Sequence, residues 1–168
     1  MSAPASSNDI LSEAQSARRA EIVELLIGAY WMEIETVMSY IANSINPDGV
    51  RAQQVTQSLA ADVQAELGHA QQFARRIKEL YGTVPGSLEL RASQESLQPP
   101  ADALDLEHVI RGVIEAERGA IEHYNHMIAV TDGVDPVTQD MLTTILADEQ
   151  GHLRTFEGFL REFAAAGA

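Results

Sequence analysis

Residues 66–69 read Glu-Leu-Gly-His, and residues 149–152 read Glu-Gln-Gly-His. Each tetrapeptide places a glutamate and a histidine three positions apart, so both side chains lie on one face of an α-helix. Another glutamate precedes each tetrapeptide at a nearly constant distance: Glu33 by 33 positions and Glu117 by 32. The repeat predicts two similar halves, each of which supplies one lone glutamate and one glutamate–histidine pair to a shared two-metal site.

Apolar residues around these elements recur every three or four positions, which is typical of amphipathic helices. The pattern covers residues 17–43, 51–81, 105–131 and 136–163, and the six predicted ligands fill gaps in the apolar stripes. Short turns rich in Asp, Asn, Gly and Pro join the first two blocks and the last two. Residues 82–103 form a longer connection with three prolines, and Gly82 is a plausible helix C-cap.

This organisation predicts an all-α protein, a four-helix bundle made of two helical hairpins that are joined by a long crossover. A chain of 168 residues suits one domain. We expect a flexible N-terminal segment over residues 1–16, the bundle over residues 17–163 and a short C-terminal tail over residues 164–168.

The composition restricts the partners. A formal net charge of −14 argues against binding to nucleic acid or to an anionic membrane, and favours cations. The chain has no cysteine, which excludes disulfides and thiolate metal sites. The N-terminal region resembles neither a signal peptide nor a membrane span, so we expect a cytoplasmic location.

Hairpin geometry brings the candidate ligands to one level. Glu33 and Glu66 lie at similar distances from the turn that joins their helices, about 20 to 25 Å at ~1.5 Å per residue. Glu117 and Glu149 have similar distances in the second hairpin. The predicted catalytic and metal-ligating residues are Glu33, Glu66, His69, Glu117, Glu149 and His152.

The chemistry of this set indicates a metal pair. Four ionised carboxylates in an apolar interior would lose hydration and repel one another, and two cations remove that conflict. Carboxylates with two imidazoles suit iron or manganese, and zinc is a possible occupant. Two ions about 3.5 to 4 Å apart can share bridging carboxylates and bind dioxygen or peroxide between them.

Several other polar residues have competing interpretations. Tyr40 and Tyr124 each follow a lone glutamate by seven positions, and each either packs in the core with a hydrogen-bonded hydroxyl or orients a ligand. Asp62 is either a carboxylate on an entry path or a hydrogen-bonded polar residue. Three glutamates lie off the apolar stripes and are expected on solvated faces: Glu35, Glu115 and Glu122.

The segments at residues 115–121 and 145–152 resemble the ferritin-like diiron superfamily, with bacterioferritins and the bacterioferritin-like (Dps-like) mini-ferritins as the nearest likenesses. The resemblance implies two iron ions per subunit, with Glu33 and Glu117 as terminal ligands and Glu66 and Glu149 as bridges. It implies His69 and His152 as terminal nitrogen ligands. Leu67 stands where bacterioferritins commonly carry the methionine that binds haem, which argues against a haem here.

The resemblance implies a ferroxidase that oxidises Fe(II) with dioxygen or hydrogen peroxide, for iron storage or detoxification in a homo-oligomer. The alternative is a diiron redox enzyme without mineral storage, such as a peroxide reductase or an oxidase. A third reading is a purely structural bundle. Native mass distinguishes the first two, because storage needs a large hollow assembly, and metal content tests the third.

Overall fold

A computed structural model describes residues 9–166, which form four long α-helices, three short 3-10 helices and no strand. Helices α1 (Ser16–Ile45) and α2 (Ala52–Glu79) make one hairpin, and α3 (Leu106–Thr131) and α4 (Pro136–Ala166) make the other. The predicted all-α bundle of two hairpins is confirmed. The helix ends lie within three residues of the predicted ones, and helix α4 continues into the predicted tail as far as Ala166.

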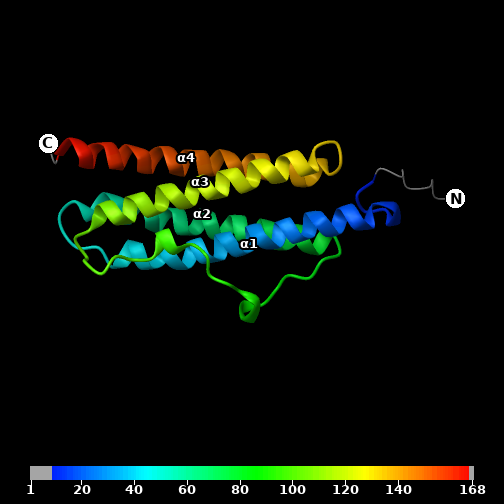
Figure 1. Ribbon diagram of the computed structural model, residues 1–168, viewed down its shortest axis with the longest axis horizontal. Coiled ribbons are helices and arrows are strands. Elements are labelled where there is room, and N and C mark those ends of the chain that lie inside the picture. Colours follow the sequence, from blue (N-terminus) through cyan, green and yellow to red (C-terminus); the bar gives the residue numbers. More distant parts are fainter. Residues whose placement is uncertain (1–8, 167–168) are drawn as a thin grey trace.

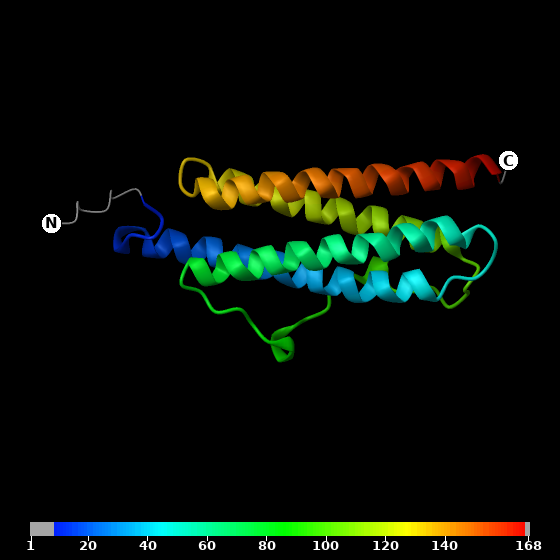
Figure 2. The same ribbon diagram turned by 180° about the vertical axis from the view of Figure 1, so that it is seen from behind.

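The crossover between α2 and α3 runs along the length of the bundle, outside the helices (Figure 1). It contains the 3-10 helices η2 (Ser87–Glu89) and η3 (Glu95–Leu97). Because it returns the chain to the end where α2 began, α2 and α3 run in the same direction (Figure 2). The described chain therefore starts and ends at opposite ends of the molecule.

The crossover is fixed to α1 by Glu35. The carboxylate of Glu35 accepts hydrogen bonds from the backbone N–H of Ser93 at 2.8 Å and of Gln94 at 2.7 Å. Glu35 is buried, so the prediction of a solvated face for this residue is wrong. Glu35 lies off the core stripe, so its side chain points away from the bundle axis. The crossover, not water, occupies that side of α1.

The backbone of η3 also lies very close to α3. A Cβ atom at Gly112 would lie 2.1 Å from the carbonyl oxygen of Ser96, so this approach requires glycine. Asn43 donates a hydrogen bond of 2.8 Å to the carbonyl of Leu97, which is buried. These contacts hold η3 against both α1 and α3.

The segment before α1 is anchored in part. Ile10 is buried in the core, and Arg19 donates hydrogen bonds of 2.9 Å to the carbonyls of Ile10 and Ser12. The 3-10 helix η1 (Glu13–Gln15) leads directly into α1. The first eight residues of the segment predicted to be flexible lie outside the described residues, as do residues 167–168.

The end of α2 differs from the expected glycine cap. Tyr81, not Gly82, adopts the left-handed conformation, with φ of 63°. The N–H of Gly82 donates a hydrogen bond of 2.8 Å to the carbonyl of Ile77. A Cβ at Gly82 would lie 2.8 Å from side-chain atoms of Ile77 and Val23, so glycine is needed here for packing.

Two apolar clusters occupy the two ends of the bundle. The first includes Phe73 and Tyr124, and the second includes Tyr40 and Phe156. The predicted ligands lie between the two clusters along the sequence of each helix, so apolar layers flank their level on both sides. Within residues 9–166, no helix is both long enough and apolar enough to cross a membrane.

Candidate metal centre

The four helices bring all six predicted ligands together. Helix α1 contributes Glu33, α2 contributes Glu66 and His69, α3 contributes Glu117, and α4 contributes Glu149 and His152. Five of these residues are buried and His152 is partly exposed. Two groups of four can be drawn from the set, and in each the ligand atoms lie within 4.8 Å of one another. Glu66 and Glu149 belong to both groups.

His69 is the centre of the first group. Its Nδ1 atom lies 3.1 Å from Glu149 Oε1, 3.2 Å from Glu66 Oε2 and 3.8 Å from Glu33 Oε1. One nitrogen thus faces three carboxylates that come from three different helices.

His152 repeats this arrangement in the second group. Its Nδ1 atom lies 3.0 Å from Glu66 Oε1, 3.5 Å from Glu149 Oε2 and 3.8 Å from Glu117 Oε1. Glu66 and Glu149 therefore each direct one oxygen toward each histidine, whereas Glu33 and Glu117 each approach one histidine. Two carboxylates are shared and two are terminal, which is the geometry of a site with two metal positions.

The two tyrosines contact the terminal glutamates. The Tyr40 hydroxyl donates a hydrogen bond to Glu117, and the Tyr124 hydroxyl donates one to Glu33. Both tyrosines are fully buried. Each hydroxyl fixes the rotamer of a carboxylate on the opposite hairpin.

Electrostatics divide the six groups into three pairs. Burial raises the pKa of Glu33 and of Glu117 well above the usual value, and the nearby carboxylates raise it further. Burial also opposes ionisation of Glu149, but its contacts with His152 and His69 outweigh that effect and lower its pKa to about 2. The same two histidines lower the pKa of Glu66 against the effect of burial.

The histidines show the matching effect. Burial alone would lower the pKa of His69, but its close contacts with the carboxylates of Glu149 and Glu66 raise it to about 10. The same opposing contributions raise the pKa of His152 to about 11. In the absence of metal, two imidazolium groups thus balance two ionised glutamates, while the terminal glutamates tend to keep their protons.

Several buried polar atoms in this cluster lack hydrogen-bond partners, namely Glu66 Oε1, Glu149 Oε1 and His152 Nδ1. Glu66 Oε1 lies 3.0 Å from His152 Nδ1, and Glu149 Oε1 lies 3.1 Å from His69 Nδ1, but neither contact has the orientation of a hydrogen bond. Buried polar atoms are nearly always satisfied, so these atoms indicate a missing ligand. Oxygen and imidazole donors from six side chains fit a pair of divalent first-row transition-metal ions.

The outer nitrogen of each histidine faces a further carboxylate. His69 Nε2 lies 3.2 Å from Asp148 Oδ2, and His152 Nε2 lies 3.7 Å from Asp62 Oδ1. A carboxylate in this position orients a metal-binding imidazole and increases its basicity. Asp148 is not among the predicted site residues, although its position four residues before His152 places it on the same side of α4.

A cavity of about 10 Å³ adjoins the glutamates between α1 and α3. Besides four of the predicted ligands, it is lined by small or neutral side chains: Thr36, Tyr40, Ala116 and Ala120. Its volume is about the smallest that can hold one water molecule. A metal-bound water or a small diatomic molecule is therefore the largest occupant that this space admits without movement.

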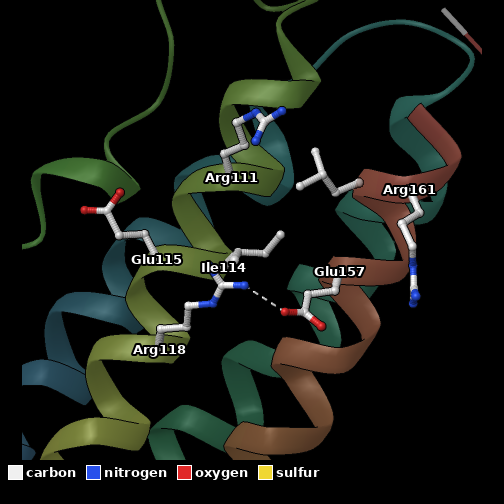
Figure 3. A pocket seen from close by; sticks show the side chains of 7 residues that line it. Arg111, Ile114, Glu115, Arg118, Glu157 and Arg161 are labelled. Carbon is white, nitrogen blue, oxygen red and sulfur yellow. Dashed lines mark hydrogen bonds and ion pairs between the residues drawn. The ribbon is translucent and has the colours of Figure 1, made fainter. Parts of the chain in front are cut away.

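A larger groove, of about 530 Å³, lies on the outer surface between α3 and α4 and includes none of the six residues (Figure 3). Arg118 and Glu157 form an ion pair of 2.9 Å across it. Glu115 lies exposed at its edge, and Glu122 is also exposed, as predicted for both. The groove does not adjoin the buried cluster, so we assign the chemistry to the cluster.

Comparison with known proteins identifies the class to which this bundle and its carboxylate–histidine cluster belong. Residues 25–166 match the ferritin family, described as the ferritin-like domain. The chain is a member of this family. The DNA protection during starvation protein of Pyrococcus furiosus is 26% identical over 144 residues, which cover 83% of this chain and 77% of the relative. The bacterioferritin of Desulfovibrio desulfuricans is 26% identical over 141 residues, or 83% and 74% of the two chains.

Solved structures share the fold. The bacterioferritin-related protein of Bacteroides fragilis, a dodecameric thioferritin, matches 89% of each chain with a TM-score of 0.80 and 24% identity. The D. desulfuricans bacterioferritin matches with a TM-score of 0.77 and 24% identity, over 90% of this chain and 85% of that one. At these identities the structural comparisons establish the ferritin-like fold.

Proposed function

We propose that this protein binds two Fe(II) ions in the intrabundle cluster and oxidises them with dioxygen or hydrogen peroxide, for iron storage or detoxification. One observation carries the proposal: Glu66 and Glu149 each direct one oxygen toward each histidine. A structural bundle has no need of such sharing, and two adjacent cations require it. The solved D. desulfuricans relative is described with a diiron site in different catalytic states, which supports iron as the metal.

The six side chains take the roles that their contacts indicate. Glu33 and Glu117 would each hold one ion, and Glu66 and Glu149 would contribute to both. His69 and His152 would each give a ring nitrogen to one ion, in the neutral form that a metal requires. The two ions would supply the redox chemistry: oxidation of two Fe(II) to two Fe(III) releases two electrons, which with two protons would reduce one hydrogen peroxide to two waters, or one dioxygen to hydrogen peroxide.

The protein's own contribution is charge balance and orientation. Four carboxylates carry four negative charges, which two divalent ions neutralise inside a core of low dielectric constant. The hydrogen bonds from Tyr40 and Tyr124 hold the terminal carboxylates in place as the ions change charge. The preformed arrangement lowers the reorganisation that oxidation would otherwise require.

Assembly into a homo-oligomer is part of the proposal. The B. fragilis relative is dodecameric, and the D. desulfuricans relative is a bacterioferritin. An acidic chain of net charge −14 needs counter-ions at any assembled surface, and Fe(II) is one such cation. Native mass decides between a large storage assembly and a small redox enzyme.

The direct test is a stopped-flow experiment. Metal-free protein is first loaded anaerobically with two Fe(II) per chain and is then mixed with air-saturated buffer or with peroxide. We expect ferric absorbance to rise much faster than in a protein-free control. The double variant Glu66→Ala/Glu149→Ala should lose this phase. A wild-type rate equal to that of the protein-free control would refute the proposal.

A further inference from the structure

The two sides of the carboxylate cluster differ in chemistry. Helices α1 and α3 pack on each other, as do α2 and α4, so the α1/α3 side and the α2/α4 side are opposite faces of the bundle. The α2/α4 side carries Asp62 and Asp148, the carboxylates next to the outer histidine nitrogens. The side chain of Asp148 is 56% exposed, so negative charge on this face reaches solvent.

On the α1/α3 side, the residues that line the cavity and are not predicted ligands are all uncharged. The cavity beside the glutamates is closed there by Thr36, Ala116 and Ala120. Thr36 is buried, but both alanines are partly exposed. A wall of small side chains, about one side chain thick, therefore separates the ligands from the outside of the bundle.

Gln94 of the crossover lies over Thr36. Its Nε2 atom donates a hydrogen bond of 2.9 Å to Thr36 Oγ1, and a second of 3.3 Å to the carbonyl of Met32. The backbone of Gln94 is held by the buried carboxylate of Glu35, which takes no part in the metal cluster. Gln94 is partly exposed, and its amide contacts Thr36, which lines the cavity.

Charge decides which substrate each face admits. A hydrated divalent cation would lose its water in passing methyl groups and an amide, which is costly, whereas a small uncharged molecule loses little. The opposite face offers carboxylates that attract cations and replace their water. On the basis of the proposed function, we propose that Thr36, Ala116 and Ala120 form the entrance for the small uncharged oxidant, that Gln94 covers it, and that the cation enters beside Asp62 and Asp148.

Nitric oxide is a suitable probe, because it is small and uncharged, and its binding to Fe(II) is visible without any oxidation. Ala120→Leu should obstruct the entrance, and Ala129→Leu, an exposed alanine on the same helix, is the matched control. With both proteins loaded anaerobically with Fe(II), we expect Ala120→Leu to slow nitric oxide binding about tenfold, which is a barrier about 1.4 kcal/mol higher. Fe(II) affinity and the control should equal wild type.

Gln94→Ala gives an independent result, because a partly exposed side chain can be removed without disturbing the core. We expect it to speed nitric oxide binding severalfold with unchanged Fe(II) affinity, while Leu88→Ala, at a fully exposed position of the same crossover, leaves the rate unchanged. An unchanged rate in Gln94→Ala, or in a folded Ala120→Leu protein, overturns the inference. Asp148→Asn should slow Fe(II) association, and an association rate equal to that of wild type would overturn the cation route.

The two proposals fail in different ways. A wild-type protein that binds Fe(II) and nitric oxide but oxidises no iron refutes the proposed function, and the Ala120→Leu comparison still decides the position of the entrance. If the wild-type protein oxidises Fe(II) rapidly and the Ala120→Leu variant is as fast as wild type in both iron oxidation and nitric oxide binding, only the proposed entrance is refuted.

Discussion

The hydroxyl of Tyr124, on α3, donates a hydrogen bond to Glu33, on α1. Tyr40, on α1, does the same for Glu117, on α3. Each tyrosine follows a lone glutamate in sequence by seven positions, yet it supports the glutamate of the other hairpin. The two bonds therefore cross-link the hairpins at the level of the cluster and couple the repeat into one site.

Replacement of Tyr124 by Phe removes one of these bonds and leaves the ring in the core. We expect the affinity for the first-row metals to fall about tenfold, the lower end of the effect seen when a group that orients a ligand is lost. We also expect the metal-free protein to lose about 1 kcal/mol of unfolding free energy. Titration calorimetry with Zn(II) and chemical denaturation measure the two effects.

Tyr81→Phe is the control for that substitution, because Tyr81 is 69% exposed and lies outside the cluster. It should change neither quantity. Equal Zn(II) affinities for Tyr124→Phe and wild type would mean that the hydroxyl serves packing alone, which is one of the two readings of the sequence.

Sharing of the central carboxylates predicts unequal losses. Glu66 faces both histidines, so Glu66→Ala should abolish tight binding of both ions. Glu33 faces only His69, so Glu33→Ala should retain one ion, held beside His152. Glu122→Ala, at an exposed position, should retain both. Metal stoichiometry after gel filtration gives the answer, and loss of both ions in Glu33→Ala would contradict the terminal role of Glu33.

Metal binding should release protons. The pKa values of about 10 for His69 and about 11 for His152 keep both rings charged near neutral pH in the metal-free protein, and a metal binds only the neutral ring. The raised pKa of Glu33 and of Glu117 adds further protons. We expect at least two and at most four protons to leave when two ions bind, as measured by calorimetry in buffers of different ionisation enthalpy. Release of fewer than two protons would show that the histidines are already neutral.

The raised pKa values of His69 and His152 also determine how the stability of the metal-free protein changes with pH. Both histidine pKa values are higher in the folded chain than the ordinary value of about 6.5. Their contribution to stability is therefore complete below that value, and the metal-free protein should lose it as the pH rises through about 10 to 11. Bound metal replaces the protons, so the loaded protein should show a smaller loss over this window.

The carboxylate beside His69 should affect metal affinity without touching the metal. Asp148→Asn keeps the shape of the side chain and removes the charge that favours a basic ring. Loss of such a partner costs about 10-fold to 100-fold in affinity, and we expect the lower value because Asp148 is largely exposed. Asp140→Asn, an exposed position on the same helix, is the control. An unchanged Zn(II) dissociation constant for Asp148→Asn would remove this carboxylate from the site.

Helical periodicity predicted the parts of this molecule that depend on the helices themselves. The apolar stripes and the gaps at Glu33 and Glu117 follow from a fixed number of residues per turn, so the hairpins and the common level of the ligands could be predicted. Contacts made by the crossover could not, because an irregular segment has no period. For that reason the prediction of a solvent-exposed Glu35 is wrong. The hydrogen bond from Tyr40 to Glu117 depends on how α1 packs against α3, which residue spacing alone does not determine.

Stability at the far end of the bundle depends on a buried ion pair that is independent of metal. Arg76, near the end of α2, donates hydrogen bonds of 2.8 and 3.0 Å to the two carboxylate oxygens of Asp135, which is fully buried. Asp135 in turn accepts a hydrogen bond from the N–H of Thr138 in the first turn of α4, and Arg76 also donates to the hydroxyl of Thr138. The pair thus caps α4 and joins the two hairpins.

Removal of Arg76 leaves a carboxylate buried without its partner, a change that costs about 3 to 5 kcal/mol. We expect Arg76→Ala to lose that much unfolding free energy, measured by chemical denaturation of the metal-free protein, and Arg75→Ala, at an exposed position, to lose almost none. Because the six ligands lie elsewhere, Arg76→Ala should still bind two ions per chain at a temperature where it is folded.

The double variant Arg76→Ala/Asp135→Ala tests whether the two residues act as a pair. It should lose less unfolding free energy than the sum of the two single variants, because Arg76→Ala already leaves Asp135 without its partner. If the two single losses of unfolding free energy add up to the loss in the double variant, Arg76 and Asp135 stabilise the protein separately. The N-terminal cap of α4 would then not depend on the charge of Arg76.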